Sequence, residues 1–393
     1  MLRPSLNFSF AAALFACALC CNIPLWAELT PTVTDRLERA LSEPPPPPPP
    51  PSLLDHPEFW SEQLSKPFTE RYAPAPKEVV DYLKWENVAD GINTVPSSVS
   101  PYPPFLRLIS GVLEGLPDEV KESVDNVFYG IFFVRGLGST AYSEYLLNNE
   151  GTPAGGFIAL DVDALERKAN EWATWKESTA FSRMGKKDYH VAITIEEGRE
   201  DNQQNALQFI LLHEIGHLLA DRVNAHPRWD KKLEEVQDLS PYSFAPLSWS
   251  IKRELVAVKR KKKELSIPFL SLFGKEEKKE MVSRYVSHYD GAFPEREDIV
   301  FYSKSPRLKR KVAPIVYHKL QQANFPSLYS AMDPYEDFAE SYAIYVHTQL
   351  LKKPYRTRVY YEDVLVMDHS SCFDSGSCPK KAAFFDALFK KEQ

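Results

Sequence analysis

From about residue 104 onward, short apolar runs alternate with segments that have helical spacing. Runs with the length or the alternation of β-strands are Val127 to Val134, Phe157 to Leu160 and Tyr189 to Ile195. Apolar residues at helical spacing predict helices over Phe105 to Leu116, Asp163 to Lys176 and about Asp201 to Val223. The stretch from Gly136 to Gly156 has the composition of a loop. Strands first and helices afterwards predict an α+β fold with a mixed sheet.

The first hundred residues lack a regular pattern. Residues 1–27 read as a signal peptide, in which Arg3 precedes an apolar run that ends before Ala27. Residues 28–56 form a linker with eight consecutive prolines, Pro44 to Pro51, which predict a stiff spacer of roughly 25 Å. Residues 57–103 are expected to be an extended arm packed on the domain that spans 104–393.

The apolar run at the N-terminus leaves two other interpretations open. Its twelve uninterrupted residues, Phe10 to Cys21, are fewer than the roughly 20 that a spanning helix needs, but the segment could stay attached as a membrane anchor. Cys17 is a candidate for lipid attachment, although Phe15 fits that pattern poorly. All three interpretations predict export, to the periplasm or cell envelope or as a secreted protein.

The cysteines agree with export. Three of the five, Cys17, Cys20 and Cys21, lie in the expected signal peptide. The other two, Cys372 and Cys378, flank Phe-Asp-Ser-Gly-Ser, and such a pair around a turn predicts a small disulfide loop. Two free thiols are the alternative, and a zinc knuckle lacks a second pair.

Composition excludes several classes of protein. The chain has 393 residues, 44% of them hydrophobic, which is enough for a sizeable core. With 54 acidic and 47 basic side chains its net charge is -7. Because nucleic-acid binding needs a dense basic face, we expect no nucleic-acid partner.

The expected helix over 201–223 carries candidate metal chemistry. It contains His213-Glu214-Ile215-Gly216-His217, which is HExxH, within an apolar sequence. Positions i and i+4 of a helix share a face, so both imidazoles can reach one ion. Glu214 lies about 100° further round, where it can take a proton from a water molecule that zinc acidifies. Two unrelated histidines on a buried helix are the alternative, but buried polar groups need partners, and a metal supplies them.

A zinc site of this type needs a third protein ligand and an open position for water. The metzincin pattern would put glycine at position 220 and histidine at position 223, but Ala220 and Val223 stand there. His226 lies too far along the chain for that spacing. A carboxylate from a later helix, Glu336, remains. We expect one zinc ion, although other divalent ions accept the same donors.

Glu336 has a second interpretation as a helix cap. Asp333 suits the N-cap, Pro334 the first helical position, and Glu336 the third, where a capping-box glutamate sits. However, Glu336 and Glu340 share one face of an apolar helix, and buried like charges need a cation. We therefore expect Glu336 to bind the metal and Glu340 to orient a ligating imidazole through its free N–H.

The sequence HEIGH followed downstream by EDFAE resembles the gluzincin zinc metallopeptidases. The similarity is greatest to the catalytic domains of the anthrax lethal factor-like family, in which HEFGH is followed by EFFAE. It extends over about residues 205–223 and 329–347, and it implies a zincin-like fold with one zinc ion.

The resemblance also implies a role for each matched residue. His213, His217 and Glu336 would be the zinc ligands, and Glu214 the general base. Tyr329, seven residues before the ligand glutamate, would donate a hydrogen bond to the oxyanion that forms during peptide hydrolysis. Neighbouring tyrosines that could be confused with it are Tyr335 and Tyr342.

The chain departs from this family in the spacing of the two motifs. Well over a hundred residues separate them, and the excess, about 230–325, includes charge runs at Lys259 to Lys263 and around Lys275 to Lys279. We expect a helical insertion. Its charges could be an ordinary solvated helix face, or the insertion could lie beside the cleft and select substrates.

Together these features predict an exported zinc endopeptidase acting on proteins or peptides, with attachment to the cell envelope through the N-terminus as one option. The strand over 189–195 is expected to be a sheet edge to which an extended peptide can add. A non-catalytic zincin-fold binding module and a zinc hydrolase of peptidoglycan peptides are the alternatives. Histidines outside the motif are expected at the surface or in loops rather than at a metal; they are His190, His288, His318, His347 and His369.

Overall fold

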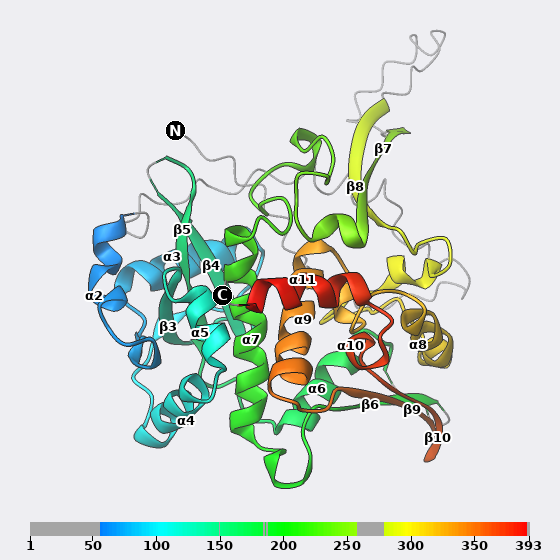
Figure 1. Cartoon of the computed structure of the whole chain (residues 1–393), viewed down its shortest axis with the longest axis horizontal. Helices are drawn as coiled ribbons and strands as arrows, with labels where there is room; N and C mark the ends of the chain where they lie inside the picture. The colour runs from blue at the N-terminus through cyan, green and yellow to red at the C-terminus, as the bar shows by residue number, and fades with distance from the viewer. Residues whose placement is uncertain (1–55, 149, 184, 186–187, 258–278, 391–393) are drawn as a thin grey trace, which may run out of the picture.

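The computed structural model describes residues 56–148, 150–183, 185, 188–257 and 279–390 (Figure 1). The expected signal peptide, the proline run and nearly all of the two charge runs lie outside these residues. Within them the chain forms helices and sheets in the α+β arrangement expected from the sequence.

The largest sheet is mixed. In it, β3 (Phe128–Arg135) pairs in parallel with both β1 (Tyr72–Pro74) and β5 (Pro153–Asp161), while β4 (Ala141–Leu147) closes one edge antiparallel to β5. The short β2 (Ser97–Ser98) pairs antiparallel with β3. The stretch 136–156, expected to be a loop, therefore contains β4 and the start of β5.

Both faces of this sheet are covered. On β3, Ile131 and Phe133 point into the main core, whereas Phe132 and Val134 point into a second hydrophobic cluster on the opposite face. This alternation is the two-residue period of a strand that is buried on both sides.

The segment 57–103 forms the second cluster and is not the extended arm that the sequence suggested. It contains α2 (Ser61–Leu64), the 13-residue α3 (Lys77–Ala89) and strand β1. Trp60, Val79 and Leu83 from this segment are almost fully buried against the sheet. The apolar spacing of α3 over Val79, Val80 and Leu83 was the overlooked signal.

Helices cover the other face of the sheet. Two of them lie side by side at the centre of the molecule, α7 (Gln203–Arg222) and α9 (Pro334–Tyr345), shown green and orange in Figure 1. The remaining α-helices are α4 (Pro103–Glu114), α5 (Asp118–Val124), α6 (Ala169–Ser178), α8 (Ala313–Gln321), α10 (Cys372–Ser375) and α11 (Pro379–Phe389).

The central helices approach closely because of a glycine. A Cβ atom on Gly216 of α7 would lie 2.9 Å from the Cα of Ala339 and 3.1 Å from its carbonyl oxygen. Only glycine fits against that backbone, so the small residues of the HEIGH and EDFAE segments are the point of contact between α7 and α9.

A smaller antiparallel sheet has the order β10 (Val364–Ser370), β9 (Arg356–Tyr361), β6 (Tyr189–Thr194). In this sheet β6 is an edge strand, as predicted. After α9 the chain makes one π-helical turn, η10 (Val346–Leu350), before it enters β9.

The insertion contains a β-hairpin where helices were expected. Strands β7 (Trp249–Ala257) and β8 (Lys279–Ser287) pair antiparallel, and α8 is the longest helix in the described part of 230–325. The charge runs at 259–263 and 275–279 had suggested a solvated helix face. Short 3-10 turns also occur: η2 (Pro57–Trp60), η3 (Phe68–Glu70), η4 (Gly198–Glu200), η5 (Leu233–Glu235), η6 (Ala245–Leu247), η7 (Pro294–Asp298), η8 (Arg310–Val312) and η9 (Tyr329–Ala331).

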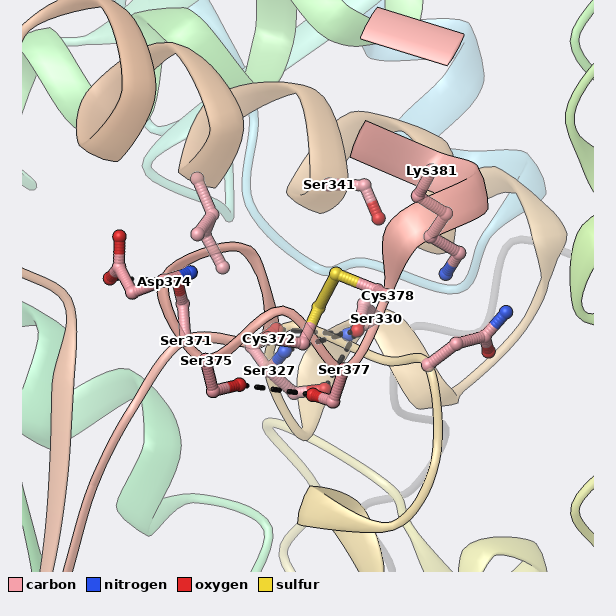
Figure 2. The surroundings of a disulfide bond; sticks show 12 residues. Ser327, Ser330, Ser341, Ser371, Cys372, Asp374, Ser375, Ser377, Cys378 and Lys381 are labelled. Atoms are coloured by element: carbon pink, nitrogen blue, oxygen red, sulfur yellow. Dashed lines mark hydrogen bonds between the residues drawn. A yellow bond between two sulfur atoms is a disulfide. The ribbon is translucent and has the colours of Figure 1, made fainter. Parts of the chain in front are cut away.

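The last described segment of the chain packs against α9 and is bonded to it. Cys372 and Cys378 form the predicted disulfide, and α11 begins directly after it (Figure 2). Lys381 of α11 makes an ion pair with Asp337 of α9, and both side chains are fully buried. The indole N–H of Trp249, at the base of the β7–β8 hairpin, also donates to Asp337, at 2.9 Å. The residue next to Glu336 is thereby held by two other parts of the chain.

None of the helices in the described residues has the length and apolarity needed to cross a membrane.

Candidate metal centre

Helix α7 presents the two histidines of HExxH on one face. The helix is capped by Asn202, whose side chain accepts a hydrogen bond from the Asn205 backbone at 3.0 Å. One turn apart, the rings of His213 and His217 have centroids 4.8 Å from each other and lie edge to face. Their Nε2 atoms are 3.2 Å apart.

Helix α9 brings a carboxylate to the same place. Asp333 caps this helix by accepting hydrogen bonds from the backbone N–H groups of Tyr335 and Glu336, at 2.9 and 3.0 Å. Glu336 itself turns toward α7, where its Oε2 lies 3.2 Å from Nε2 of His213 and 3.6 Å from Nε2 of His217. Its position in the first turn fits a cap, but its side chain faces the histidines.

These three atoms have the separations that a zinc ion requires. Bonds of about 2.0–2.1 Å at tetrahedral angles place zinc ligands roughly 3.3 Å from one another. The observed separations are 3.2, 3.2 and 3.6 Å. In addition, the Oε2 atom of Glu336 is buried without a hydrogen bond, which is costly unless another group satisfies it. His213, His217 and Glu336 can therefore hold a metal ion.

The site is open on one side. The side chains of His217 and Glu336 are 26% and 21% exposed, compared with 12% for His213. Solvent can thus reach the side where His217 and Glu336 lie, as a centre with an open coordination position needs.

The charges of the site favour a bound cation. Burial alone would lower the pKa of His213, but contacts with the Glu336 and Glu340 carboxylates raise it to about 9. Burial would raise the pKa of Glu336, yet its contacts with His213 and His217 hold it well below its usual range. A metal ion at Nε2 of His213 would replace the proton that faces Glu336, while Nδ1 keeps its proton toward Glu340.

Glu340 lies behind His213, on the side away from His217. Its Oε2 atom is 3.0 Å from Nδ1 of His213 and 2.7 Å from the ammonium of Lys176. This places Glu340 where the sequence suggested, against the second nitrogen of a candidate ligand. Lys176 was not anticipated, since nothing in the pattern of its helix distinguishes it from a surface lysine.

Tyr329 and Glu214 complete the group of expected residues. The hydroxyl of Tyr329, in η9, donates to Oε1 of Glu336 at 3.2 Å. Glu214 is buried on α7 next to His213. The two other tyrosines point elsewhere: the hydroxyl of Tyr335 pairs with that of Tyr285 at 3.0 Å, and Tyr342 packs against Gly216.

Tyr302 is a further aromatic residue at this site that the sequence did not suggest. It has φ of +58°, a strained conformation for a residue other than glycine, and its ring lies 6.2 Å from that of Tyr329. Its side chain is 44% exposed, but desolvation of its hydroxyl, followed by the charges of Glu340 and Glu336, raises its pKa above the usual value. Glu214 also contributes to this effect.

The remaining histidines do not join the group. The ring of His190 stacks on Tyr360, and His288 contacts the hydroxyl of Ser250 at 3.0 Å. The expectation was wrong for His347, which is 1% exposed and whose Nε2 lies 2.7 Å from the carbonyl oxygen of Ile195. His226 is also buried, and burial lowers its pKa to about 4.

No protein-family model, curated protein or solved structure matches this chain. The assignment of a metal centre therefore depends on the distances and contacts between its residues.

Proposed function

We propose that the protein is a zinc-dependent endopeptidase of the gluzincin type. The observation that carries the proposal is the triangle formed by Nε2 of His213, Nε2 of His217 and Oε2 of Glu336, whose sides match those of a tetrahedral zinc site. Glu214, the general base of HExxH enzymes, follows His213 on the same helix.

In this proposal a bound zinc ion supplies Lewis acidity, which polarises the peptide carbonyl and acidifies a water molecule. Glu214 accepts the proton of that water and delivers it to the leaving amine, because one carboxylate can act as base and then as acid. Tyr329 donates a hydrogen bond to the carbonyl oxygen as negative charge develops there. In the free protein the same hydroxyl donates a hydrogen bond to Glu336, a proposed zinc ligand, so it lies next to the place where the substrate carbonyl would bind.

We propose β6 and β4 as sheet edges to which an extended peptide could add. Strand β6 is the edge of the smaller sheet, as the sequence suggested, and β4 is the edge of the larger one. Strand β4 also packs against α7, the helix that carries HExxH.

We propose export for the same protein. A buried disulfide, Cys372–Cys378, suits an oxidising compartment and agrees with the expected signal peptide. A protein or peptide is the proposed substrate.

The proposal is tested by incubating the chain without residues 1–27 with a mixed-sequence peptide library. A Glu214→Gln variant with verified zinc content is the control. We expect cuts by the wild type alone, abolished by a chelator and restored by zinc. If zinc-loaded wild type cuts no peptide, digestion of purified sacculi separates the alternatives: release of muropeptides indicates the peptidoglycan hydrolase, and no release indicates the binding module.

A further inference from the structure

Lys176 is a buried cation beside the metal centre to which the proposed reaction gives no role. It lies near the end of α6, and its side chain is 7% exposed. A lysine almost never occupies such a position unless a specific partner compensates its charge. Its partner is Glu340, which is 2% exposed.

The ion pair extends to a candidate zinc ligand through a single oxygen atom. Oε2 of Glu340 lies 2.7 Å from Nζ of Lys176 and 3.0 Å from Nδ1 of His213. Three groups from three helices therefore form one row: the ammonium from α6, the carboxylate from α9 and the imidazole from α7. The far end of this row is Nε2 of His213, which faces Glu336 and His217.

The same ammonium touches a second residue of the site. Nζ of Lys176 lies 4.0 Å from the centre of the Tyr329 ring, within the range of a cation–π contact, and 5.5 Å from that of Trp172. Tyr329 in turn donates to Glu336. Lys176 thus contacts Glu340, which lies against the candidate ligand His213. It also contacts Tyr329, which bonds to the candidate ligand Glu336.

We propose that Lys176 is a positioning residue of the metal centre, acting on His213 through Glu340 and holding the ring of Tyr329. This inference rests on the proposed metal site. Partners of a metal-ligating histidine fix its ring and tautomer, and their loss typically weakens metal binding 10–100-fold. A carboxylate held by two donors has less freedom to turn away from the imidazole than one held by the imidazole alone.

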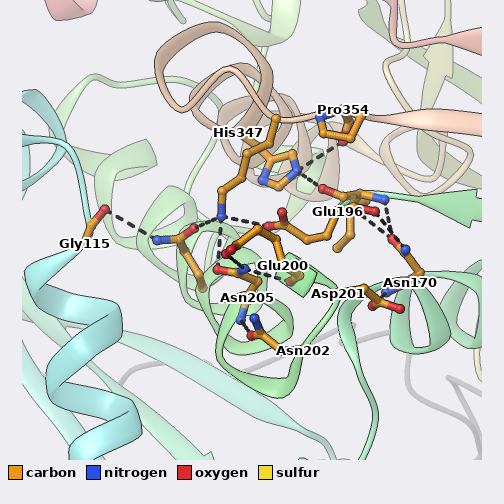
Figure 3. Close-up of polar contacts among 12 residues, drawn as sticks. Gly115, Asn170, Glu196, Glu200, Asp201, Asn202, Asn205, His347 and Pro354 are labelled. Atoms are coloured by element: carbon orange, nitrogen blue, oxygen red, sulfur yellow. Dashed lines mark hydrogen bonds and ion pairs between the residues drawn. The ribbon is translucent and has the colours of Figure 1, made fainter. Parts of the chain in front are cut away.

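Lys353 is a control lysine that also pairs with a buried carboxylate; its side chain is 20% exposed, compared with 7% for Lys176. Lys353 donates to Oε1 of Glu196 at 2.7 Å, the same distance as in the Lys176–Glu340 pair, and Glu196 is also 2% exposed. Lys353 further bonds to Asn205 and Gln208 in the first turns of α7. Figure 3 shows this network around Glu196 and Asn205, which contains none of the candidate ligands.

The test is the zinc affinity of the full chain, measured by competition with a chromogenic chelator. Lys176→Met should weaken zinc binding about tenfold, whereas Lys353→Met should change it less than twofold. Thermal unfolding of the metal-free proteins reports the stability that each substitution costs. A purely structural role would lower stability in both variants and leave zinc affinity unchanged in both.

A double-substitution cycle tests the route through Glu340. If Lys176 acts through Glu340, adding Lys176→Met to Glu340→Gln should cause no further loss of zinc affinity. This double variant removes both buried charges, so it is informative even if Lys176→Met alone fails to fold. Full additivity of the two losses would overturn the inference.

The readout separates this inference from the proposed activity. Unchanged zinc affinity in Lys176→Met, with a wild type that binds zinc, would refute the role of Lys176 alone. Lysine-dependent zinc binding without peptide cleavage would support it and refute the peptidase. A wild type that binds no zinc would refute both.

Discussion

Two roles compete for Glu336, that of a helix cap and that of a metal ligand. The structure gives the capping role to Asp333, which receives both backbone N–H groups. The carboxylate of Glu336 is left facing His213 and His217, with one buried oxygen that accepts no hydrogen bond. Metal binding is the role that gives this oxygen a partner.

Tyr329 should contribute to catalysis but not to metal binding. Tyr329→Phe removes the hydroxyl and leaves the ring and its contact with Lys176, so kcat should fall about 10²–10³-fold, as for the loss of one oxyanion donor. Steady-state kinetics and chelator competition would measure kcat and zinc affinity separately.

Tyr335→Phe is the matched control, since that hydroxyl pairs with Tyr285 instead. It should leave kcat nearly unchanged, because its hydroxyl bonds to Tyr285 and not to Glu336. An unchanged kcat in Tyr329→Phe would contradict the assignment and direct attention to Tyr302.

For single residues, the sequence was most informative where spacing along a helix determines which side chains lie close together. His213 and His217 are one helical turn apart whatever the rest of the fold does, so their shared face was predictable. Lys176 and Tyr302 reach the site from segments far away in the sequence, and no local pattern distinguishes them from surface residues.

The pair of helices α7 and α9 is the element that assembles the site. Each helix supplies part of the ligand set, so the distance between them sets the distance between the histidines and Glu336. Gly216 determines that distance, because the Ala339 backbone lies where its side chain would be.

Gly216→Ala should therefore affect both stability and metal binding. The added methyl group meets backbone atoms, which cannot rotate away, so we expect the free energy of unfolding to fall by about 1–3 kcal/mol. Zinc affinity should also fall, because α9 must move away from α7 and carry Glu336 with it. Chemical denaturation and chelator competition would measure the two effects.

Gly111→Ala in α4 is the control for this substitution. A Cβ atom there would first meet Nε2 of the flexible Gln204 side chain, at 3.1 Å, so the change should be tolerated. If Gly216→Ala unfolds and binds zinc like the wild type, the close contact does not set the geometry of the site.

Helices and strands were predictable from the sequence where their apolar residues follow a single helical or strand period. The strands β3 and β6 and the helices α4 and α7 were expected within a few residues of their observed bounds. The edge strand β4 was missed because only its second half is buried, and a half-exposed strand gives no continuous apolar run. In the insertion, the charge runs at 259–263 and 275–279 favoured a helical interpretation, whereas the described residues of this segment contain a β-hairpin.

At the scale of the whole molecule, the largest sheet is mixed and carries a hydrophobic core on each face. The second core depends on segment 57–103, and at its centre is Trp60, which is 1% exposed and stacks on Tyr129 with ring centroids 4.9 Å apart. This segment is an integral part of the fold, which argues against a removable inhibitory segment over these residues.

Trp60→Ala should lower the free energy of unfolding by about 3–5 kcal/mol, the usual loss for a large buried aromatic residue. Zinc affinity of the protein that remains folded should not change, because the sheet lies between this cluster and α7. If the variant instead kept its stability and cleaved peptides faster, the segment would be an inhibitory one.

The central claim is that His213, His217 and Glu336 bind one zinc ion beside Glu214. X-ray diffraction from zinc-loaded crystals, recorded on both sides of the zinc absorption edge, tests it most directly. The account predicts one anomalous peak at about 2.0–2.2 Å from both Nε2 atoms and from Oε2 of Glu336. A zinc peak at other residues, or none at this triangle in a protein shown to contain zinc, would contradict it.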